Sequence, residues 1–264
     1  MRLRAILFLS LLLIFPSISS SEEIKGPQAQ TQQNSMVEIE GRYWMPTLSG
    51  MINKGDGLIG TNVNITETLG IEEDQKFFQG KLTLKFLGRN KIRFSYLPLS
   101  IDGSRVITES FNFSGKTYTV NTLVNSSLDA KIYKIGYGLD IISNPVGSFG
   151  VFIDLNYADI SATVEAPDLG FYESGSVTGY LPAIGISGRV FVIPNRLSFS
   201  GEIEGMQISD MGSYLESEVS VDYRIIENLG VSLGYKTINL KAEKDNDRGE
   251  LNISGPYFSL LLRF

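Results

Sequence analysis

In the stretch Tyr257–Phe264, YFSLLLRF, one of the two sets of alternate positions is apolar throughout, up to the last residue. Phe258, Leu260, Leu262 and Phe264 take every second position, and in an extended strand every second side chain points to the same face. Chain ends usually fray. An ordered, apolar strand that runs to the final residue therefore indicates that this end has a role of its own.

The same period of two recurs from Met36 onward. Between Phe78 and Phe86, apolar side chains dominate the even positions and polar ones, such as Lys81 and Lys85, the odd positions. A helix with this spacing would have no apolar stripe. The pattern predicts ten strands, at residues 36–47, 77–87, 91–101, 129–142, 148–163, 177–193, 196–208, 214–226, 230–241 and 250–264.

The predicted connections alternate between short and long. Residues that accept turn geometry mark tight turns at 88–90, 143–147, 194–195 and 227–229, and longer polar loops are expected at 48–76, 102–128, 164–176, 209–213 and 242–249. An even strand number suits an antiparallel barrel with both termini at one end. We expect residues 106–124 to form a hairpin outside the barrel. The alternatives are twelve strands, if this hairpin spans, or eight.

Composition excludes several classes of protein. The 264 residues contain no Cys and no His, and the formal net charge is -6. Disulfides, lipoprotein attachment through cysteine, and His-based catalysis or metal binding are therefore excluded. A nucleic-acid partner would need a basic face, so none is expected. The sequence indicates no cofactor.

The first residues are typical of an export signal. Arg2 and Arg4 precede an apolar run, residues 5–15, and small residues follow it. This run is too short for a spanning helix, which needs about 20 apolar residues. We expect a signal peptide at residues 1–21, a flexible polar leader at 22–35 and one barrel domain at 36–264.

Three all-β architectures fit two-faced strands of this kind. A soluble sandwich or a lipocalin-like barrel turns its apolar face inward, whereas a membrane barrel turns it outward to lipid. Most predicted strands reach the length of about 9–11 residues that a tilted strand needs to cross a bilayer. Aromatic residues near strand ends are candidates for interfacial girdles: Tyr43, Tyr96, Tyr133, Tyr157, Tyr180, Tyr223 and Tyr235. Trp44 is interpreted in the same way.

The C-terminal row decides between these architectures. Phe258, Leu260, Leu262 and Phe264 resemble the C-terminal targeting strand of bacterial outer-membrane β-barrel proteins, which the barrel-assembly machinery recognises. The resemblance implies a closed, antiparallel, up-and-down transmembrane barrel in the outer membrane of a Gram-negative cell envelope. Its implied partners are outer-membrane lipid, lipopolysaccharide and the assembly machinery.

Charged side chains lie on the face that such a barrel turns inward. Basic residues come from the second to fourth strands and acidic residues from the seventh and eighth: Lys81, Lys85, Arg93 and Lys134, with Glu202, Glu204, Glu216, Glu218 and Asp222. They could meet across the lumen as an ion-pair network, which we favour because small barrels are mostly filled by side chains. Alternatively, the carboxylates could form a cation-attracting wall.

Two functions remain open at this stage. The first is a structural or surface-interaction role through long extracellular loops, and the second is a narrow passive channel for small solutes or cations. Enzymatic activity is not expected, because the resembling outer-membrane hydrolases and transferases rely on a catalytic His. Carboxylate-pair chemistry, at Glu202 with Glu204 or at Glu216 with Glu218, is the formal exception.

The C-terminal row gives the first prediction. Deleting Phe264, or making the substitution Phe264→Asp, should lower outer-membrane insertion, because the assembly machinery would lose the aromatic end that it recognises. Secretion across the inner membrane should stay intact. Fractionation of the cell envelope measures both steps. Unchanged insertion would remove the evidence that the end is an assembly signal.

Overall fold

The computed structural model describes most of the chain that follows the predicted leader. The described residues are 36–54, 61–64, 66, 71–106, 111–113, 116–118, 120–208, 212–244 and 247–264. They belong to one compact unit. The expected signal peptide and leader lie outside them. No helix among the described residues is long and apolar enough to span a membrane.

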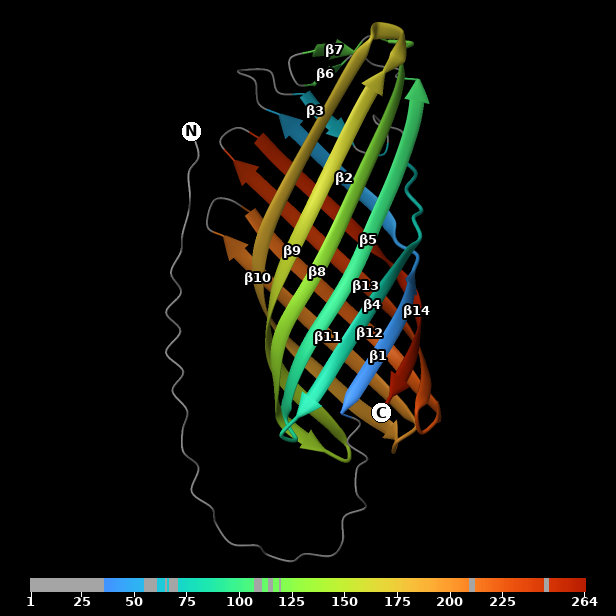
Figure 1. The fold of residues 1–264 in the computed structure, drawn as a ribbon, viewed down its shortest axis with the longest axis vertical. Helices are drawn as coiled ribbons and strands as arrows, with labels where there is room; N and C mark the ends of the chain where they lie inside the picture. Colours follow the sequence, from blue (N-terminus) through green and yellow to red (C-terminus); the bar gives the residue numbers. More distant parts are fainter. Residues whose placement is uncertain are drawn as a thin grey trace, which may run out of the picture. The chain divides into compact units, whose positions relative to one another are not determined.

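Within the described residues, ten strands form one closed antiparallel ring (Figure 1). In ring order they are β1 (Val37–Trp44), β4 (Phe77–Phe86), β5 (Asn90–Val106), β8 (Leu123–Asn144), β9 (Gly147–Ala166), β10 (Phe171–Ile193), β11 (Leu197–Ile208), β12 (Gly212–Ile226), β13 (Leu229–Lys244) and β14 (Asp247–Arg263). Each pairs with the next, and β14 pairs with β1 to close the ring. The predicted up-and-down barrel of about ten strands is confirmed.

The remaining elements extend this ring or lie outside it. After Met45 and Pro46 the chain continues as β2 (Thr47–Lys54), which pairs with β14 beyond β1 and with β3 (Thr61–Asn64). β6 (Phe111–Phe113) and β7 (Lys116–Tyr118) form a separate two-stranded sheet. The expected hairpin outside the barrel is therefore confirmed, and the twelve-strand alternative is wrong. A short 3-10 turn, η1 (Pro167–Leu169), joins β9 to β10.

All four predicted tight turns lie at one end of the barrel, which we call the turn end. Leu87 and Gly88 in the β4–β5 turn, and Asn195 in the β10–β11 turn, adopt positive φ angles of 49°, 72° and 58°. The barrel also begins and ends here. The Val37 amide donates to the Phe264 carbonyl over 3.1 Å, and the Phe264 amide donates to the Val37 carbonyl over 2.9 Å. The closing strand is therefore hydrogen-bonded to its last residue. The opposite end is called the loop end.

The apolar face changes sides along the longest strands. On the turn-end part of β5, Phe94 and Tyr96 point outward, while Leu97, Leu99 and Ile101 beyond them are buried inside. Two adjacent apolar residues, Tyr96 and Leu97, produce this switch, because neighbouring side chains point to opposite faces. The outer wall is therefore apolar toward the turn end and polar toward the loop end.

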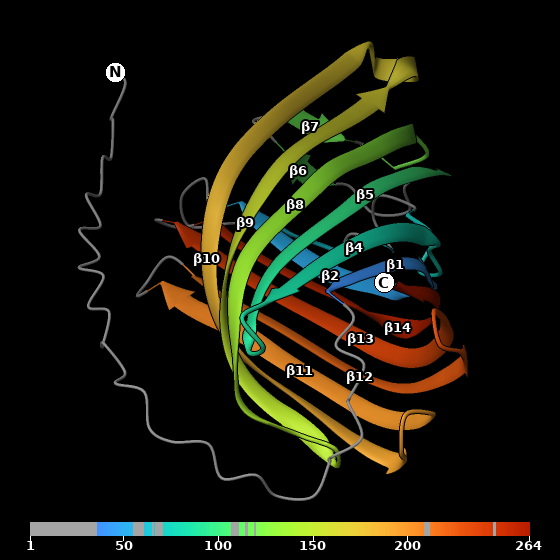
Figure 2. The same ribbon diagram turned by 60° about the horizontal axis from the view of Figure 1, so that its bottom comes forward.

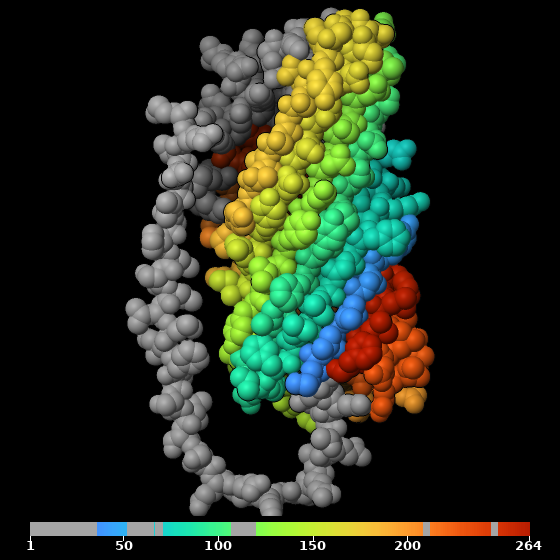
Figure 3. Space-filling model, in the orientation of Figure 1, coloured from blue at the N-terminus to red at the C-terminus, as the bar shows by residue number. Residues whose placement is uncertain are grey.

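Four outward tyrosines mark the level of the switch. Tyr96, Tyr133, Tyr157 and Tyr180 are direct partners on β5, β8, β9 and β10, and their successive ring centroids lie 4.8, 6.2 and 5.0 Å apart. We call this row the tyrosine ladder. These four predicted girdle residues thus form one row across neighbouring strands of the outer wall, and Figure 3 shows these strands packed side by side.

Beyond the tyrosine ladder, β5, β8, β9 and β10 continue as a four-stranded sheet, which we call the blade (Figures 1 and 2). It comprises residues 97–106, 123–132, 158–166 and 171–179. The prediction of long loops at 102–128 and 164–176 was thus wrong over much of their length. Along most of the blade the outward side chains are polar and the inward ones apolar, which is the reverse of the turn-end parts of the same strands. The blade therefore did not continue the pattern from which the strands were predicted.

An apolar plug fills the lumen near the ladder. It consists of Trp44, Leu48, Ile71, Phe77, Leu97, Leu99, Ile101, Ala130, Ile253 and Tyr257. Ile71 reaches it from the segment before β4. Backbone hydrogen bonds from Leu48 to the Glu73 carbonyl and from Gln75 to the Pro46 carbonyl, both 2.8 Å, hold this segment beside the start of β2. A β-bridge between Ile71 and Gly103 fixes its other side.

Trp44 corrects the prediction of an interfacial anchor. Its side chain is fully buried in the plug, packs near Phe77 with ring centroids 6.1 Å apart and donates from Nε1 to the Gly255 carbonyl over 3.1 Å. Tyr43 and Met45 flank it on the outward face, so apolar side chains occur on both faces here. Alternation alone could not assign the ring to one side.

Candidate functional site

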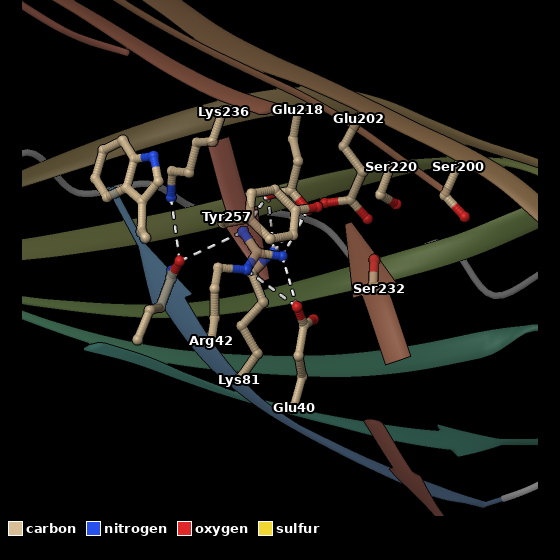
Figure 4. A network of polar contacts seen from close by, with 12 residues as sticks. Glu40, Arg42, Lys81, Ser200, Glu202, Glu218, Ser220, Ser232, Lys236 and Tyr257 are labelled. Carbon is tan, nitrogen blue, oxygen red and sulfur yellow. Dashed lines mark hydrogen bonds and ion pairs between the residues drawn. The ribbon is translucent and has the colours of Figure 1, made fainter. Parts of the chain in front are cut away.

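The lumen on the turn-end side of the plug is polar. A cavity of about 90 Å³ lies there, lined by side chains of β1, β4, β5, β8, β10, β11, β12, β13 and β14. At about 10–15 Å³ for each water centre, it has room for several waters. The charged residues around it form contacts across the ring, which Figure 4 shows from close by.

Arg42 on β1 is the centre of this network. Its guanidinium makes two 2.7 Å hydrogen bonds to the two carboxylate oxygens of Glu218 on β12, and a third of 2.7 Å to Glu40. Lys81 adds an ion pair of 3.1 Å to Glu218, and the Tyr257 hydroxyl donates to it over 2.8 Å. The Arg42 guanidinium also lies 3.7 Å from the centroid of the Tyr257 ring.

A second group of contacts joins β8, β11, β12 and β13. The Lys134 ammonium bridges the carboxylates of Glu204 and Glu216, and Lys236 lies 3.2 Å from Glu216. The hydroxyl of Tyr214 lies between the same two carboxylates, at 2.9 and 2.6 Å. All five side chains are largely removed from solvent. The two acids are therefore held by cations from two different walls of the barrel.

Arg93 connects β5 to β9 and β11. Its guanidinium lies 2.7 Å from Glu202 and 3.9 Å from Asp154, and stacks 4.0 Å above the Phe152 ring. Asp154 is buried, and neither of its carboxylate oxygens has a hydrogen-bond partner among the described residues. A Cβ at Gly136 would lie 1.7 Å from one of these oxygens. Only glycine leaves room for the Asp154 side chain on the facing strand.

Further ion pairs lie toward the turn end. Glu38 accepts from Arg263 over 2.7 Å and lies 3.9 Å from Lys85. Asp222 lies 3.7 Å from Arg189. The Asp222 carboxylate also accepts hydrogen bonds from four serine hydroxyls, those of Ser198, Ser200, Ser220 and Ser232.

The structure brings together seven of the nine sequence-predicted lumen residues as basic and acidic partners: Lys81, Arg93 and Lys134 with Glu202, Glu204, Glu216 and Glu218. Lys85 and Asp222 pair instead with Glu38 and Arg189. Each of the five predicted acids thus has a cationic partner, so this face is a charge-compensated network. No group of three or more acidic, His or Cys side chains among the described residues could hold a metal ion.

Sequence reasoning missed several members of the network. Arg42, which occupies its centre, follows Glu38 and Glu40 at alternate positions of the first strand. The same alternation that separated inward from outward residues on other strands would have placed these three charged residues on the inward face. Lys236 was missed in the same way, because its strand was not divided into faces. Partners across the lumen could not be assigned, since they depend on how the ring closes.

The C-terminal row lies on the outside of β14. Phe258, Leu260, Leu262 and Phe264 are exposed on the outer wall, whereas the residues between them are buried inside. The two faces predicted for YFSLLLRF are thus separated as expected. The inward residues take part in the plug and the network through Tyr257 and Arg263.

A solved structure shares this architecture. The outer-membrane protease OmpT from Escherichia coli superimposes with a TM-score of 0.54 at 12% identity, over 86% of this chain and 97% of OmpT. The chain has the fold of the bacterial outer-membrane β-barrel proteins. The translocator domain of the autotransporter NalP from Neisseria meningitidis has a TM-score of 0.49 at 11% identity, over 89% of this chain and 90% of its own. No protein-family model and no curated protein sequence matches the chain.

The network makes a quantitative prediction about Arg42 and Glu218. Arg42→Met or Glu218→Met alone should each lower the free energy of unfolding by about 3–5 kcal/mol, because each leaves a buried charge without its main partner. The double variant should lose less than the sum of the two, with a coupling of about 1–3 kcal/mol. Urea unfolding in lipid vesicles, followed by the fluorescence of the single tryptophan Trp44, measures these values.

The matched control is the ion pair Lys241–Glu250, whose side chains are 56% and 55% exposed. Neutralising it with Lys241→Gln and Glu250→Gln should change the stability by less than about 1 kcal/mol, since water screens exposed charges. Additive effects of the Arg42 and Glu218 substitutions would show that the two residues act independently.

Proposed function

We propose that this chain is exported, inserted into the bacterial outer membrane by the barrel-assembly machinery, and acts at the cell surface as an interaction protein through its blade. The signal-like N-terminus and the outward C-terminal row support export and assembly. The apolar outer wall between the tyrosine ladder and the turn end supports contact with lipid and lipopolysaccharide. Short turns of such barrels face the periplasm and longer connections the outside, so the blade would project from the cell.

The observation that carries this proposal is the exchange of faces at the tyrosine ladder. Beyond Tyr96 the outer face of β5 is polar, while Leu97, Leu99 and Ile101 on its inner face are buried and apolar, which is the pattern of a sheet with water on its outer side. A barrel whose only role was to span the membrane could end at the tyrosine ladder. Here four consecutive strands of the ring continue beyond it.

The charge of the blade suggests which partners it would favour. Its exposed acidic side chains outnumber the basic ones: Asp102, Asp129, Asp159, Glu165 and Asp168 against Arg105 and Lys131. Complementary charge steers encounters and raises association rates. We therefore expect a partner with a basic surface, whose binding weakens as salt rises.

A narrow channel is the second candidate, since the polar cavity of about 90 Å³ lies inside the barrel. Two features argue against conduction. Glu218 is neutralised by Arg42 and Lys81, so it offers no open carboxylate to a cation. Toward the loop end the lumen contains the apolar plug, with Trp44 and Ile71 buried in it.

Catalysis is not part of the proposed function. OmpT is a protease, but at 12% identity this likeness concerns the fold alone. The present chain contains no His. Its carboxylates Glu204 and Glu216 bind Lys134 and Tyr214 and are buried beneath the plug, where a polymeric substrate would have no access.

Shortening the blade tests the surface role. Residues 103–126 and 162–175 can be replaced by Asn-Gly turns, because Asp102 faces Ser127 and Ser161 faces Ser176 in the ladder of hydrogen bonds. Cells with the intact protein should bind at least one member of a panel of extracellular proteins and glycans. The shortened protein should bind it at least tenfold less tightly, a loss of about 1.4 kcal/mol or more.

A matched control shortens the β13–β14 hairpin instead, by joining Lys241 to Glu250, which are also direct partners. This variant should bind as the intact protein does. Equal binding by all three proteins, or no binding by any, would contradict a surface role for the blade.

Planar-bilayer conductance tests the channel. We expect no reproducible current steps from the purified protein, because the ion pairs and the plug occupy the lumen. The decisive comparison is the double variant Glu202→Gln and Glu218→Gln. Cation-selective steps from the wild type that lose their selectivity in this variant would establish the channel instead.

A further inference from the structure

The turn end of the lumen contains a cluster of arginines that neither the surface role nor the ion-pair network explains. Arg189, Arg196, Arg224 and Arg263 surround a small cavity of about 10 Å³, enough for the centre of one water-sized group. Asp222 is the one carboxylate in its lining. Four guanidinium groups thus share this space with a single acid.

Nearby carboxylates compensate only part of this charge. Arg263 is paired with Glu38 over 2.7 Å, and Arg189 lies 3.7 Å from Asp222. Within the described part of the chain, neither Arg196 nor Arg224 makes an ion pair within 4.0 Å.

The backbone holds the arginines in this arrangement. Asn195, at a positive φ of 58°, bends the β10–β11 turn so that the Arg196 amide donates to the Ile193 carbonyl over 2.9 Å. The Arg196 carbonyl in turn accepts from the Arg224 amide over 2.8 Å, which ties this turn to the end of β12. The backbones of the two arginines without an ion-pair partner therefore lie next to each other.

Two irregularities in strand pairing flank the same cavity. The register shifts between Phe191 and Ile193 on β10, and between Arg224 and Ile226 on β12. Such bulges redirect side chains and occur often beside functional sites. The bulge on β12 comes directly after Arg224, which turns toward the lumen while Ile225 and Ile226 are exposed on the outside.

We propose that this cavity is a binding site for an oxyanion, a phosphate or a carboxylate group, at the turn-end mouth of the barrel. Arg196 and Arg224 would bind it directly, since a guanidinium fork matches the oxygens of either group. Arg189 and Arg263 raise the positive potential behind it and stay paired with Asp222 and Glu38. One ligand oxygen enters the cavity, and the rest of the group remains at the mouth.

In the orientation proposed above, this mouth faces the periplasm. The anion could then be a free ion or a group carried by a periplasmic molecule. The site itself depends on the positions of the arginines and not on the surface role, so the failure of one proposal would leave the other in place.

Titration with inorganic phosphate and with acetate tests the site. The complete barrel, purified in detergent, is titrated with each anion at constant ionic strength made up with chloride, and the Nε–Hε resonances of the arginine side chains are followed by NMR. We expect saturable shifts of the Arg196 and Arg224 resonances. The tighter of the two anions identifies the group as phosphate or carboxylate.

Variants separate a site from general screening of charge. Arg224→Gln and Arg196→Gln should each weaken binding at least tenfold, and Arg224→Lys, which keeps the charge but loses the fork, should give an intermediate loss. The matched control is Arg248→Gln at the loop end, where the side chain is 72% exposed, and it should bind as the wild type does.

Three results would overturn the proposal. The first is the absence of saturation with either anion, and the second is an equal response to chloride, which would indicate screening alone. The third is unchanged affinity in a double variant with Arg196→Gln and Arg224→Gln. Resistance of each folded barrel to protease confirms that a variant has kept its structure, and the single Lys variant serves where a Gln variant does not fold.

Discussion

The closing pair of strands, β1 and β14, is the constraint on which the other features depend. A sheet exposed to lipid cannot leave backbone N–H and C=O groups unpaired, because no water is present to replace the lost hydrogen bonds. Closure satisfies them, down to the two hydrogen bonds between Val37 and Phe264. It also encloses an interior that is too narrow for bulk water. The polar faces of the ten strands are then satisfied mainly by one another, because the cavity between them has room for only several waters.

The ion pairs follow from this enclosure. Ring order places β4 five positions from β11 and β5 five positions from β12, so residues far apart in the sequence become neighbours across the lumen. A buried ion pair recovers little more than the cost of removing its charges from water. The Arg42–Glu218 pair instead favours one strand register over all others. Arg42 and Glu218 each contact three hydrogen-bonding groups only if every intervening strand has the correct register. A shift by one residue would turn these charges toward the lipid.

Much of the fold could be predicted from the sequence, because the alternation of apolar and polar residues shows directly that the two faces of a strand lie in different surroundings. The ten strands and the inward position of residues such as Lys81 and Glu218 follow from it, whereas the four tight turns follow from residues that accept turn geometry. Trp44 and the blade could not be predicted in this way. At Trp44 both faces are apolar, and above Tyr96 the apolar residues lie on the inner face and not the outer one. The pairing of Lys85 with Glu38 also required the closed ring, which no single strand reveals.

The tyrosine ladder divides each of four strands into two segments, one whose outer face is apolar and suits lipid and one whose outer face is polar and suits water. The two segments are therefore free to change to different degrees during evolution. Segments below it must keep their length, because the bilayer sets it. Segments above it can grow or shrink in steps of two residues on each side of a hairpin, which preserves both the pairing and the inner face. In the orientation proposed above, lineages could thus vary the height of the blade, and with it the reach of the protein from the cell, while leaving the membrane-embedded part of the sequence unchanged.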